Sequence, residues 1–334
     1  MGRSDAMSAL PEGIHEFLHV AGWGDCEIDP IPGDASFRRY FRIRRGDEGA
    51  MLMHAPPPHE DPEPFLKVGS WLTGHGLRAP EVYAADPAAG WILLEDFGND
   101  RMRDWLDLQP DGEHSAYSGA IDALVELHDK PAGPFAPYDM EVYQREAGLF
   151  TEWYCPAVGL SVDESAYRSA WQDALVPMLE RQDPGVTVLR DYHAENIMLL
   201  GDPREGAPQG LIDFQDALVG HPAYDLVSLL QDARRDVSVE LERAMLDRYL
   251  ASADASEDFE ADYARLGAQR NAKIVGIFTR LYKRDGKARY LDFIPRVWEA
   301  MERDLAHPAL APVAHWFDAN IPAELRAKLG GEVK

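Results

Sequence analysis

The stretch LRDYHAENIMLL, residues Leu189 to Leu200, places ionisable and amide side chains directly before a short apolar run. Its polar part has the spacing D-x-x-x-x-N, formed by Asp191 and Asn196, and the apolar part predicts a buried strand. A further acid follows in LIDF, where Asp213 ends another short apolar run. Two acids and an amide on loops beside short strands suit phosphoryl transfer. One carboxylate can accept the proton of an attacking hydroxyl, while hard oxygen ligands hold Mg²⁺.

The same residues also have a purely structural interpretation. Asp and Asn are common in turns because their side chains bond the nearby backbone. Taken alone, D-x-x-x-x-N therefore fits two capped turns. The surrounding pattern favours a site, because a strand-rich segment precedes this stretch, helices follow it, and Asp213 lies close behind.

The hydrophobic pattern divides the chain of 334 residues into two parts. The first part predicts helices at 8–21 and 65–73 and strands at 37–43, 50–54, 82–85 and 91–94. The second part predicts helices at 100–128, 141–153, 165–181, 222–252, 258–283 and 288–304, and short strands at 186–189, 197–200 and 211–212. We therefore expect an α+β protein with a small β-rich lobe at 1–95 and a larger helical lobe at 96–334.

Composition excludes several classes of function. Lys and Arg number 33 against 58 Asp and Glu, which gives a net charge of −25 and disfavours nucleic acid and anionic membrane surfaces as partners. An acidic surface also favours solubility or a cationic substrate. Cys26 and Cys155 form no metal or disulfide pattern, and no apolar run reaches the length of a membrane span or a signal peptide. The expected location is the cytoplasm.

Several motifs together resemble a known family. GDASFRRYFRI (33–43), LLEDFG (93–98), LRDYHAEN (189–196) and LIDFQDA (211–217) are similar to the aminoglycoside phosphotransferase-like branch of the protein-kinase fold. The resemblance implies a two-lobed kinase-like fold that uses ATP and Mg²⁺. With GIFTRLYKRDGKARYL (276–291), the motifs look more narrowly like the bacterial cell-wall-recycling anomeric kinases. Those enzymes phosphorylate N-acetylmuramate and N-acetylglucosamine to sugar 1-phosphates.

The resemblance implies roles for individual residues. Asp191 would be the catalytic base, with Asn196 and Asp213 as metal ligands. Asp225 resembles the family's Asp at the start of the helix after the metal loop, and we expect it to cap that helix or brace the loop rather than to bind metal. The remaining implied contacts are to the nucleotide: a loop over the phosphates at Gly33, Asp34, Ala35 and Ser36, and hinge backbone groups for adenine at Glu95 and Phe97. An ordinary turn at 33–36 and an ordinary strand exit at 95–97 remain alternatives.

The chain also departs from the kinase pattern. Leu189 stands two residues before Asp191, where the wider signature has histidine or a small polar residue. The strand lysine of the V-A-I-K motif is absent, because the segment reads AMLMH and places Met53 or His54 there. We expect that Arg38 or Arg39 reaches the nucleotide phosphates instead; a solvated basic edge strand is the alternative.

Four residues near aromatic or catalytic motifs are candidates for acceptor binding. His193 and Glu195 follow Asp191 closely; the alternative for His193 is that it braces the loop, and the alternative for Glu195 is that it faces solvent. Glu152 and Trp153 could form a sugar platform, since an aromatic face packs on pyranose C–H groups and a carboxylate accepts from hydroxyls. A core position for this aromatic patch is the alternative.

A basic island at 280–287 stands out in this acidic chain. Arg280 and Arg284 could hold a substrate carboxylate such as the lactyl group of N-acetylmuramate. Alternatively, these cations complement the dipole at the end of a helix.

The sequence thus predicts an ATP- and Mg²⁺-dependent kinase of a small-molecule sugar. Three alternatives stay open: a kinase of an aminoglycoside or another hydroxylated acceptor, a nucleotide-binding pseudoenzyme, and a non-catalytic acidic interaction module. Asp191, Asn196 and Asp213 occurring together argue against the last two.

Overall fold

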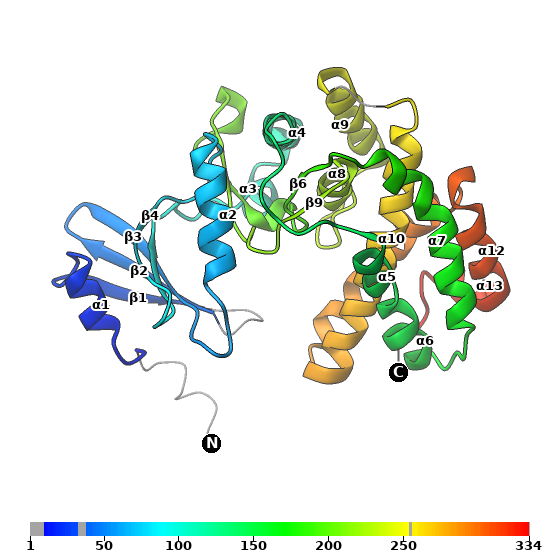
Figure 1. Cartoon of the computed structure of the whole chain (residues 1–334), viewed down its shortest axis with the longest axis horizontal. Helices are drawn as coiled ribbons and strands as arrows, with labels where there is room; N and C mark the ends of the chain where they lie inside the picture. Colours follow the sequence, from blue (N-terminus) through cyan, green and yellow to red (C-terminus); the bar gives the residue numbers. More distant parts are fainter. Residues whose placement is uncertain (1–9, 33–37, 254–255, 334) are drawn as a thin grey trace. The chain divides into compact units, whose positions relative to one another are not determined.

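The computed structural model describes residues 10–32, 38–253 and 256–333. The chain forms two compact units (Figure 1). The first contains residues 1–101 and 198–216, and the second contains residues 102–197 and 217–334. The functional division into lobes at 1–95 and 96–334 stays a prediction.

The first unit is built on a five-stranded antiparallel sheet with the order β1-β2-β3-β5-β4. The strands are β1 (Glu27–Ile31), β2 (Arg39–Arg45), β3 (Glu48–His54), β4 (Val82–Asp86) and β5 (Trp91–Leu94). Successive strand residues face opposite sides of a sheet. On one side, Phe41 and Leu52 pack with Leu18 of α1 (Ile14–Val20) in a buried cluster. Residues of the other parity, among them Tyr40 and its register partner Met53, face the opposite side.

A small sheet from much later in the chain completes this unit. It pairs β7 (Ile197–Leu199) with β8 (Gln209–Leu211), and the short helix η4 (Pro203–Glu205) lies between them in sequence. The Leu199 amide donates to the Asp100 carbonyl at 2.7 Å, and the Leu211 amide donates to the Arg78 carbonyl at 2.8 Å. These two bonds attach β7 and β8 to earlier parts of the first unit, and so position the residues that follow β8.

Phe214 anchors the loop after β8. It is buried, and its ring stacks on Phe65 of α2 (Glu63–Gly74) with centroids 4.9 Å apart. Gly69, one turn further along α2, lies in contact with the same ring. Asp213 immediately precedes Phe214, so the packing of the Phe214 ring fixes the backbone that carries Asp213.

The second unit is mainly helical (Figure 1). Its α-helices are α3 (Met102–Leu108), α4 (Glu113–His128), α5 (Met140–Ala147), α6 (Cys155–Ala157), α7 (Glu164–Arg181), α8 (Ala223–Leu230), α9 (Val239–Ser252), α10 (Phe259–Asp285), α11 (Ile294–Leu305), α12 (Ala311–Asn320) and α13 (Ala323–Arg326). Its other elements are the π-helix η2 (Phe150–Tyr154), the 3₁₀ helices η1 (Pro110–Gly112), η3 (Ala194–Asn196), η5 (Ala288–Phe293) and η6 (Pro308–Leu310), and the antiparallel pair β6 (Val186–Val188) and β9 (Leu218–Gly220).

Helix α10 is the central element of the second unit and packs against α5, α8, α11 and η2. At Gly276 it touches the main chain next to η2: a Cβ added there would lie 2.4 Å from the Leu149 carbonyl carbon and oxygen. Only glycine fits at that distance, so this contact sets where α10 and its side chains lie.

Most predicted elements are confirmed, and the exceptions have physical causes. The predicted helix at 222–252 is two helices, because α8 ends at Leu230 and Ser238 caps a new one. The predicted helix at 100–128 breaks at η1, which begins with Pro110. β1 was not predicted, because Pro30 interrupts its sequence pattern. The strand forms nevertheless, because β1 lies at the edge of the sheet, where proline is tolerated. Among the described residues, no helix has both the length and the apolar character that a membrane crossing needs.

Candidate active site

The loop that carries Asp191 is braced from below by one buried carboxylate. Asp225 of α8 accepts hydrogen bonds from the backbone amides of Leu189, at 2.6 Å, and Arg190, at 2.8 Å. Arg190 has a positive φ of 72°, so the chain turns sharply here and its amide points at Asp225. Burial raises the pKa of Asp225 to about 7, although the two backbone donors act in the opposite direction. The predicted bracing role of Asp225 is confirmed.

A second chain of contacts holds the same turn from α10. Arg270 donates to the Ser228 hydroxyl at 2.7 Å, and that hydroxyl donates to the Arg190 carbonyl at 3.2 Å. Both Arg270 and Ser228 are buried. The backbone immediately before Asp191 is therefore fixed at its donor and acceptor groups alike.

The charge on Asp191 depends on nearby cations. Burial is the largest single influence and alone would raise the pKa of Asp191, but the electrostatic effects of Lys273 on α10, His193, Arg270 and Arg190 together outweigh it. The pKa of Asp191 is consequently lower than that of an ordinary aspartate. The group is held as a carboxylate, which is the form that a proton acceptor needs.

Lys273 is itself fixed by a buried acid. Its Nζ lies 3.0 Å from Glu146 Oε2 and donates to the Tyr224 hydroxyl at 3.2 Å. Glu146, on α5, also pairs with Arg190 and accepts from the Tyr138 hydroxyl. Burial would raise the pKa of Glu146, but Lys273 and Arg190 lower it. The result is a paired set of charges in which no ion is buried alone.

Asn196 is oriented by its own loop. Its side-chain nitrogen donates to the Asp191 carbonyl at 2.9 Å and lies 3.5 Å from His193 Nε2. These contacts direct the amide nitrogen into the loop, so the side-chain oxygen is the atom with the chemistry of a metal ligand.

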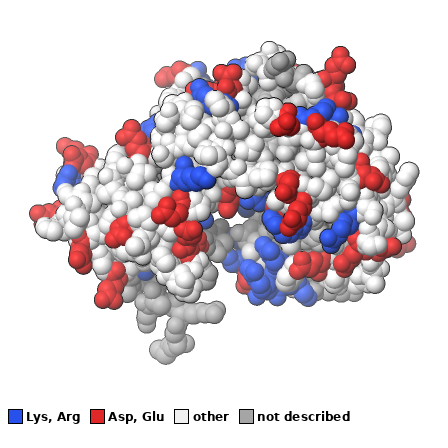
Figure 2. Space-filling model, in the orientation of Figure 1, with Lys and Arg blue, Asp and Glu red and all other residues white. Residues whose placement is uncertain are grey.

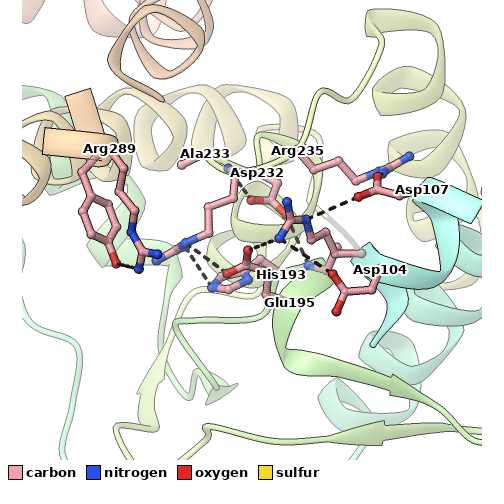
Figure 3. Close-up of polar contacts among 12 residues, drawn as sticks. Asp104, Asp107, His193, Glu195, Asp232, Ala233, Arg235 and Arg289 are labelled. Carbon is pink, nitrogen blue, oxygen red and sulfur yellow. Dashed lines mark hydrogen bonds and ion pairs between the residues drawn. The ribbon is translucent and has the colours of Figure 1, made fainter. Parts of the chain in front are cut away.

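His193 and Glu195 take part in a network of polar contacts (Figure 3). Glu195 lies between two arginines, with Oε1 3.2 Å from Arg103 Nη1 and Oε2 3.3 Å from Arg234 Nε. Arg234 also donates to His193 Nε2 at 3.1 Å. Burial lowers the pKa of His193 to about 4, so its ring is neutral at pH 7. These contacts fit the interpretation that both residues brace the loop; binding of an acceptor by either residue stays a prediction.

Asp213 belongs to the first unit. It has a positive φ of 58°, and its side chain is 47% exposed. Oδ1 accepts from Gln215 Nε2 at 2.9 Å and lies 3.5 Å from Arg38 Nη1. A carboxylate held in an exposed tight turn beside a cation is placed to meet a charged ligand.

The predicted hinge residues are tied together by one arginine. Arg78 forms a two-fold contact with Glu95, at 2.7 and 2.5 Å, and its guanidinium lies over the Phe97 ring, 4.5 Å from the centroid. This pairing lowers the pKa of Glu95. The Glu95 amide donates to the Glu81 carbonyl at 2.9 Å, so that N–H is already engaged. Any hinge contact through Glu95 must therefore use its carbonyl.

The predicted sugar platform lies on the π-helix η2. Phe150 and Tyr154 of this helix are fully buried, whereas Glu152 is exposed and Trp153 half-buried. Glu152 lines a cavity of about 430 Å³ together with residues of α5 and α7. The aromatic patch is therefore partly core, and the platform role of Glu152 and Trp153 stays a prediction.

The basic island at 280–287 covers the last turns of α10 and the two residues that follow it. Lys and Arg gather there on a face otherwise rich in Asp and Glu (Figure 2). Arg284 is exposed and pairs with Asp285 at 2.7 and 2.9 Å. Arg280 is half-buried, and its Nε has no hydrogen-bond partner among the residues that the structure describes. Of the two arginines predicted to bind a substrate carboxylate, Arg284 is already paired with Asp285, whereas Arg280 has an N–H group that can still donate.

The predicted site residues fall into two groups. Asp191, His193, Glu195 and Asn196 lie on one short loop of the second unit. Asp213, Arg38, Glu95 and Phe97 belong to the first unit. The predicted loop at Gly33–Ser36 lies outside the described residues. Sequence reasoning missed Lys273 and Glu146, whose only signal is an ionisable residue on the buried stripe of a helix.

Residues 27–268 match the model of the phosphotransferase enzyme family. The chain belongs to this family, and the predictions of a phosphotransferase and of its family are confirmed.

Curated relatives resemble the chain over nearly its whole length. A protein of Caulobacter vibrioides is 38% identical, over 93% of this chain and 96% of its own. A protein of Pseudomonas aeruginosa is also 38% identical, over 94% of both chains. One of Neisseria meningitidis is 37% identical, over 86% of this chain and 89% of its own. Each is named N-acetylmuramate/N-acetylglucosamine kinase.

Solved structures show the fold. A putative aminoglycoside phosphotransferase of Ralstonia eutropha matches with a TM-score of 0.62 at 17% identity, over 93% of this chain and 99% of its own. A choline/ethanolamine kinase family protein of Mesorhizobium loti matches with a TM-score of 0.60 at 15% identity, over 93% and 97%. The predicted kinase-like α+β fold is confirmed.

Asp225→Asn tests the brace. An amide nitrogen would face a backbone N–H, so we expect the free energy of unfolding to fall by about 1–3 kcal/mol and kcat to fall with it. Because the pKa of Asp225 is raised, its contribution to stability is complete below pH about 4 and is lost as the pH rises through about 7. The variant should lack this slope in denaturant titrations.

The matched control is Asp122→Asn, which breaks only an exposed ion pair with Arg248 and should change stability by less than about 1 kcal/mol. Equal stability of the two variants would contradict the assigned brace.

Proposed function

We propose that the chain is an ATP- and Mg²⁺-dependent kinase that phosphorylates the anomeric hydroxyl of N-acetylmuramate and N-acetylglucosamine. The observation that carries the proposal is the shared name of four relatives that are 32–38% identical over at least 86% of this chain. The motifs shared with the anomeric kinases support the position of the phosphate. The product would be a sugar 1-phosphate, and the place of the reaction the cytoplasm, in the recycling of cell-wall sugars.

The chemistry assigned to the chain centres on Asp191. Its carboxylate accepts the proton of the anomeric hydroxyl as the sugar oxygen bonds to the γ-phosphorus and the bond from that phosphorus to the β-phosphate oxygen breaks. ADP leaves with the electron pair of the broken bond. Because the pKa of Asp191 is low, its side chain is already an ionised carboxylate before the sugar binds.

Asn196 and Asp213 are the proposed ligands of Mg²⁺. An amide oxygen and a carboxylate are hard donors, and two protein groups suffice for an ion that keeps several waters. The geometry of each residue fits: the Asn196 nitrogen is turned into its loop, and Asp213 sits in an exposed tight turn. When bound, the ion would neutralise charge on the transferring phosphate.

Adenine recognition falls to the backbone at Glu95 and Phe97. The base presents an amino donor next to a ring-nitrogen acceptor, so a carbonyl and an N–H two residues apart complement it. Since the Glu95 amide is engaged with Glu81, we assign the Glu95 carbonyl and the Phe97 amide to these contacts. The loop at Gly33–Ser36 would cover the phosphates.

Arg280 is the proposed ligand of the acceptor carboxylate. Lys273, Arg280 and Arg284 are spaced seven and eleven residues apart on α10 and so share one face of the helix. Arg280 lies about 10 Å along the helix axis from Lys273, and Lys273 borders Asp191. A sugar whose anomeric hydroxyl meets Asp191 would extend along this face.

The direct test of the proposed function is product analysis. We expect the chain with ATP and Mg²⁺ to convert N-acetylglucosamine and N-acetylmuramate to products that have lost their reducing end and show a glycosyl phosphate signal in phosphorus NMR. Asp191→Asn should lower kcat roughly 10²–10⁴-fold while the melting temperature stays near that of the wild type.

A product that keeps its reducing end would contradict anomeric transfer and favour another hydroxyl. ATP binding without turnover on any acceptor would instead indicate the pseudoenzyme.

Arg280→Met tests acceptor selection. N-acetylmuramate carries a carboxylate and N-acetylglucosamine does not, so we expect KM for the first to rise about tenfold and KM for the second to change less than twofold. Arg248→Met, which removes an exposed cation paired with Asp122, is the control and should affect neither. A parallel rise in both KM values would contradict the role.

A further inference from the structure

Because the strand lysine of the kinase pattern is absent, β3 provides no cation that could neutralise nucleotide phosphates. β3 contains no lysine, and Met53, at the expected place, is only 1% exposed. His54 is no substitute, because its ring stacks on Trp91 with centroids 4.0 Å apart and so lies on the α1 side. The phosphates of a nucleotide need a cation from elsewhere in the chain.

The side of the sheet that faces away from α1 carries such a cation. Alternation along the strand places Arg38 on the same side as Tyr40, whose register partner is Met53. Arg38 is thus one strand away from the position where a β3 lysine would stand. Its side chain is 17% exposed, so most of it is packed while part still meets solvent.

Two acids hold the Arg38 guanidinium. Its Nε donates to Glu60 Oε2 at 3.3 Å, and its Nη1 lies 3.5 Å from Asp213 Oδ1. Glu60, just before α2, has a side chain that is only 18% exposed. In protein kinases a strand lysine is paired with a helix glutamate and lies near the metal-binding aspartate. The same three charges occur here: Arg38 directly precedes β2, Glu60 lies in the loop before α2, and Asp213 lies in the turn after β8.

We propose that Arg38, held by Glu60, binds the phosphates of a nucleoside di- or triphosphate in place of the missing β3 lysine. The inference rests on the proposed function, since it takes ATP as the phosphoryl donor. A guanidinium suits the task, because its planar fork can keep one N–H on a carboxylate and direct others to phosphate oxygens.

The structure also distinguishes Arg38 from its neighbour. The Arg39 guanidinium lies over the Phe41 ring, 5.1 Å from the centroid, and Phe41 belongs to the buried cluster around α1. Arg39 therefore faces the α1 side of the sheet. Of the two arginines considered from the sequence, Arg38 is the one on the side of Asp213.

The test is calorimetric titration of ATP, ADP and adenosine, with Mg²⁺ present, into the full chain and its variants. For Arg38→Met we expect the Kd of ATP and of ADP to rise about tenfold or more, because a charge-assisted contact is lost, while the Kd of adenosine changes less than twofold. Arg38→Lys should fall between wild type and Arg38→Met. Glu60→Gln should weaken ATP binding more than adenosine binding.

Arg39→Met is the matched control, since it removes the next cation along the chain, which faces the other side of the sheet. This variant should bind ATP within twofold of wild type. Melting temperatures check the folding of every variant; if Arg38→Met does not fold, Arg38→Gln is measured in its place. ATP affinity unchanged by loss of the Arg38 charge, or equal weakening of ATP and adenosine, would overturn the assignment. A wild-type chain that binds no ATP would instead refute the proposed function.

Discussion

The ion-pair arrangement around Lys273 is the constraint on which the catalytic loop depends. The Asp191 side chain is half-buried, and desolvation alone favours its neutral form. Lys273 makes the largest of the electrostatic contributions that together reverse that preference, and it is itself stabilised by Glu146. Because Glu146 also pairs with Arg190, the residue next to Asp191, removing Glu146 would leave the charges of Lys273 and Arg190 without their partner.

The rest of the second unit serves to place these charges. Helix α10 supplies Arg270 and Lys273, and its position is fixed where Gly276 touches the main chain at Leu149. Helix α8 supplies Asp225, which holds the backbone of the same loop. A loop of about six residues therefore takes its geometry from two helices, which is how a fixed scaffold presents an otherwise mobile segment.

Local sequence patterns predicted much of this protein and missed what depends on long-range contacts. The spacing of Asp191, Asn196 and Asp213 is readable because each residue borders a short apolar strand. Lys273 and Glu146 were not predicted, since they lie in helices 82 and 45 residues away from Asp191 in sequence and only tertiary packing brings their charges to the loop. Glu60 was missed for the same reason: it lies in the loop before α2, so only the folded chain shows that Arg38 pairs with Glu60.

The most direct test of this account is the pH dependence of kcat/KM for the wild type and for Lys273→Met. Lys130→Met, which removes a half-buried lysine paired with Glu126, is the control. A base must be ionised, so activity is lost as the pH falls through the pKa of Asp191. Removal of the Lys273 charge should raise that pKa and move the acid limb to higher pH, whereas the control should leave it in place. A folded Lys273→Met enzyme with an unmoved acid limb would contradict the account.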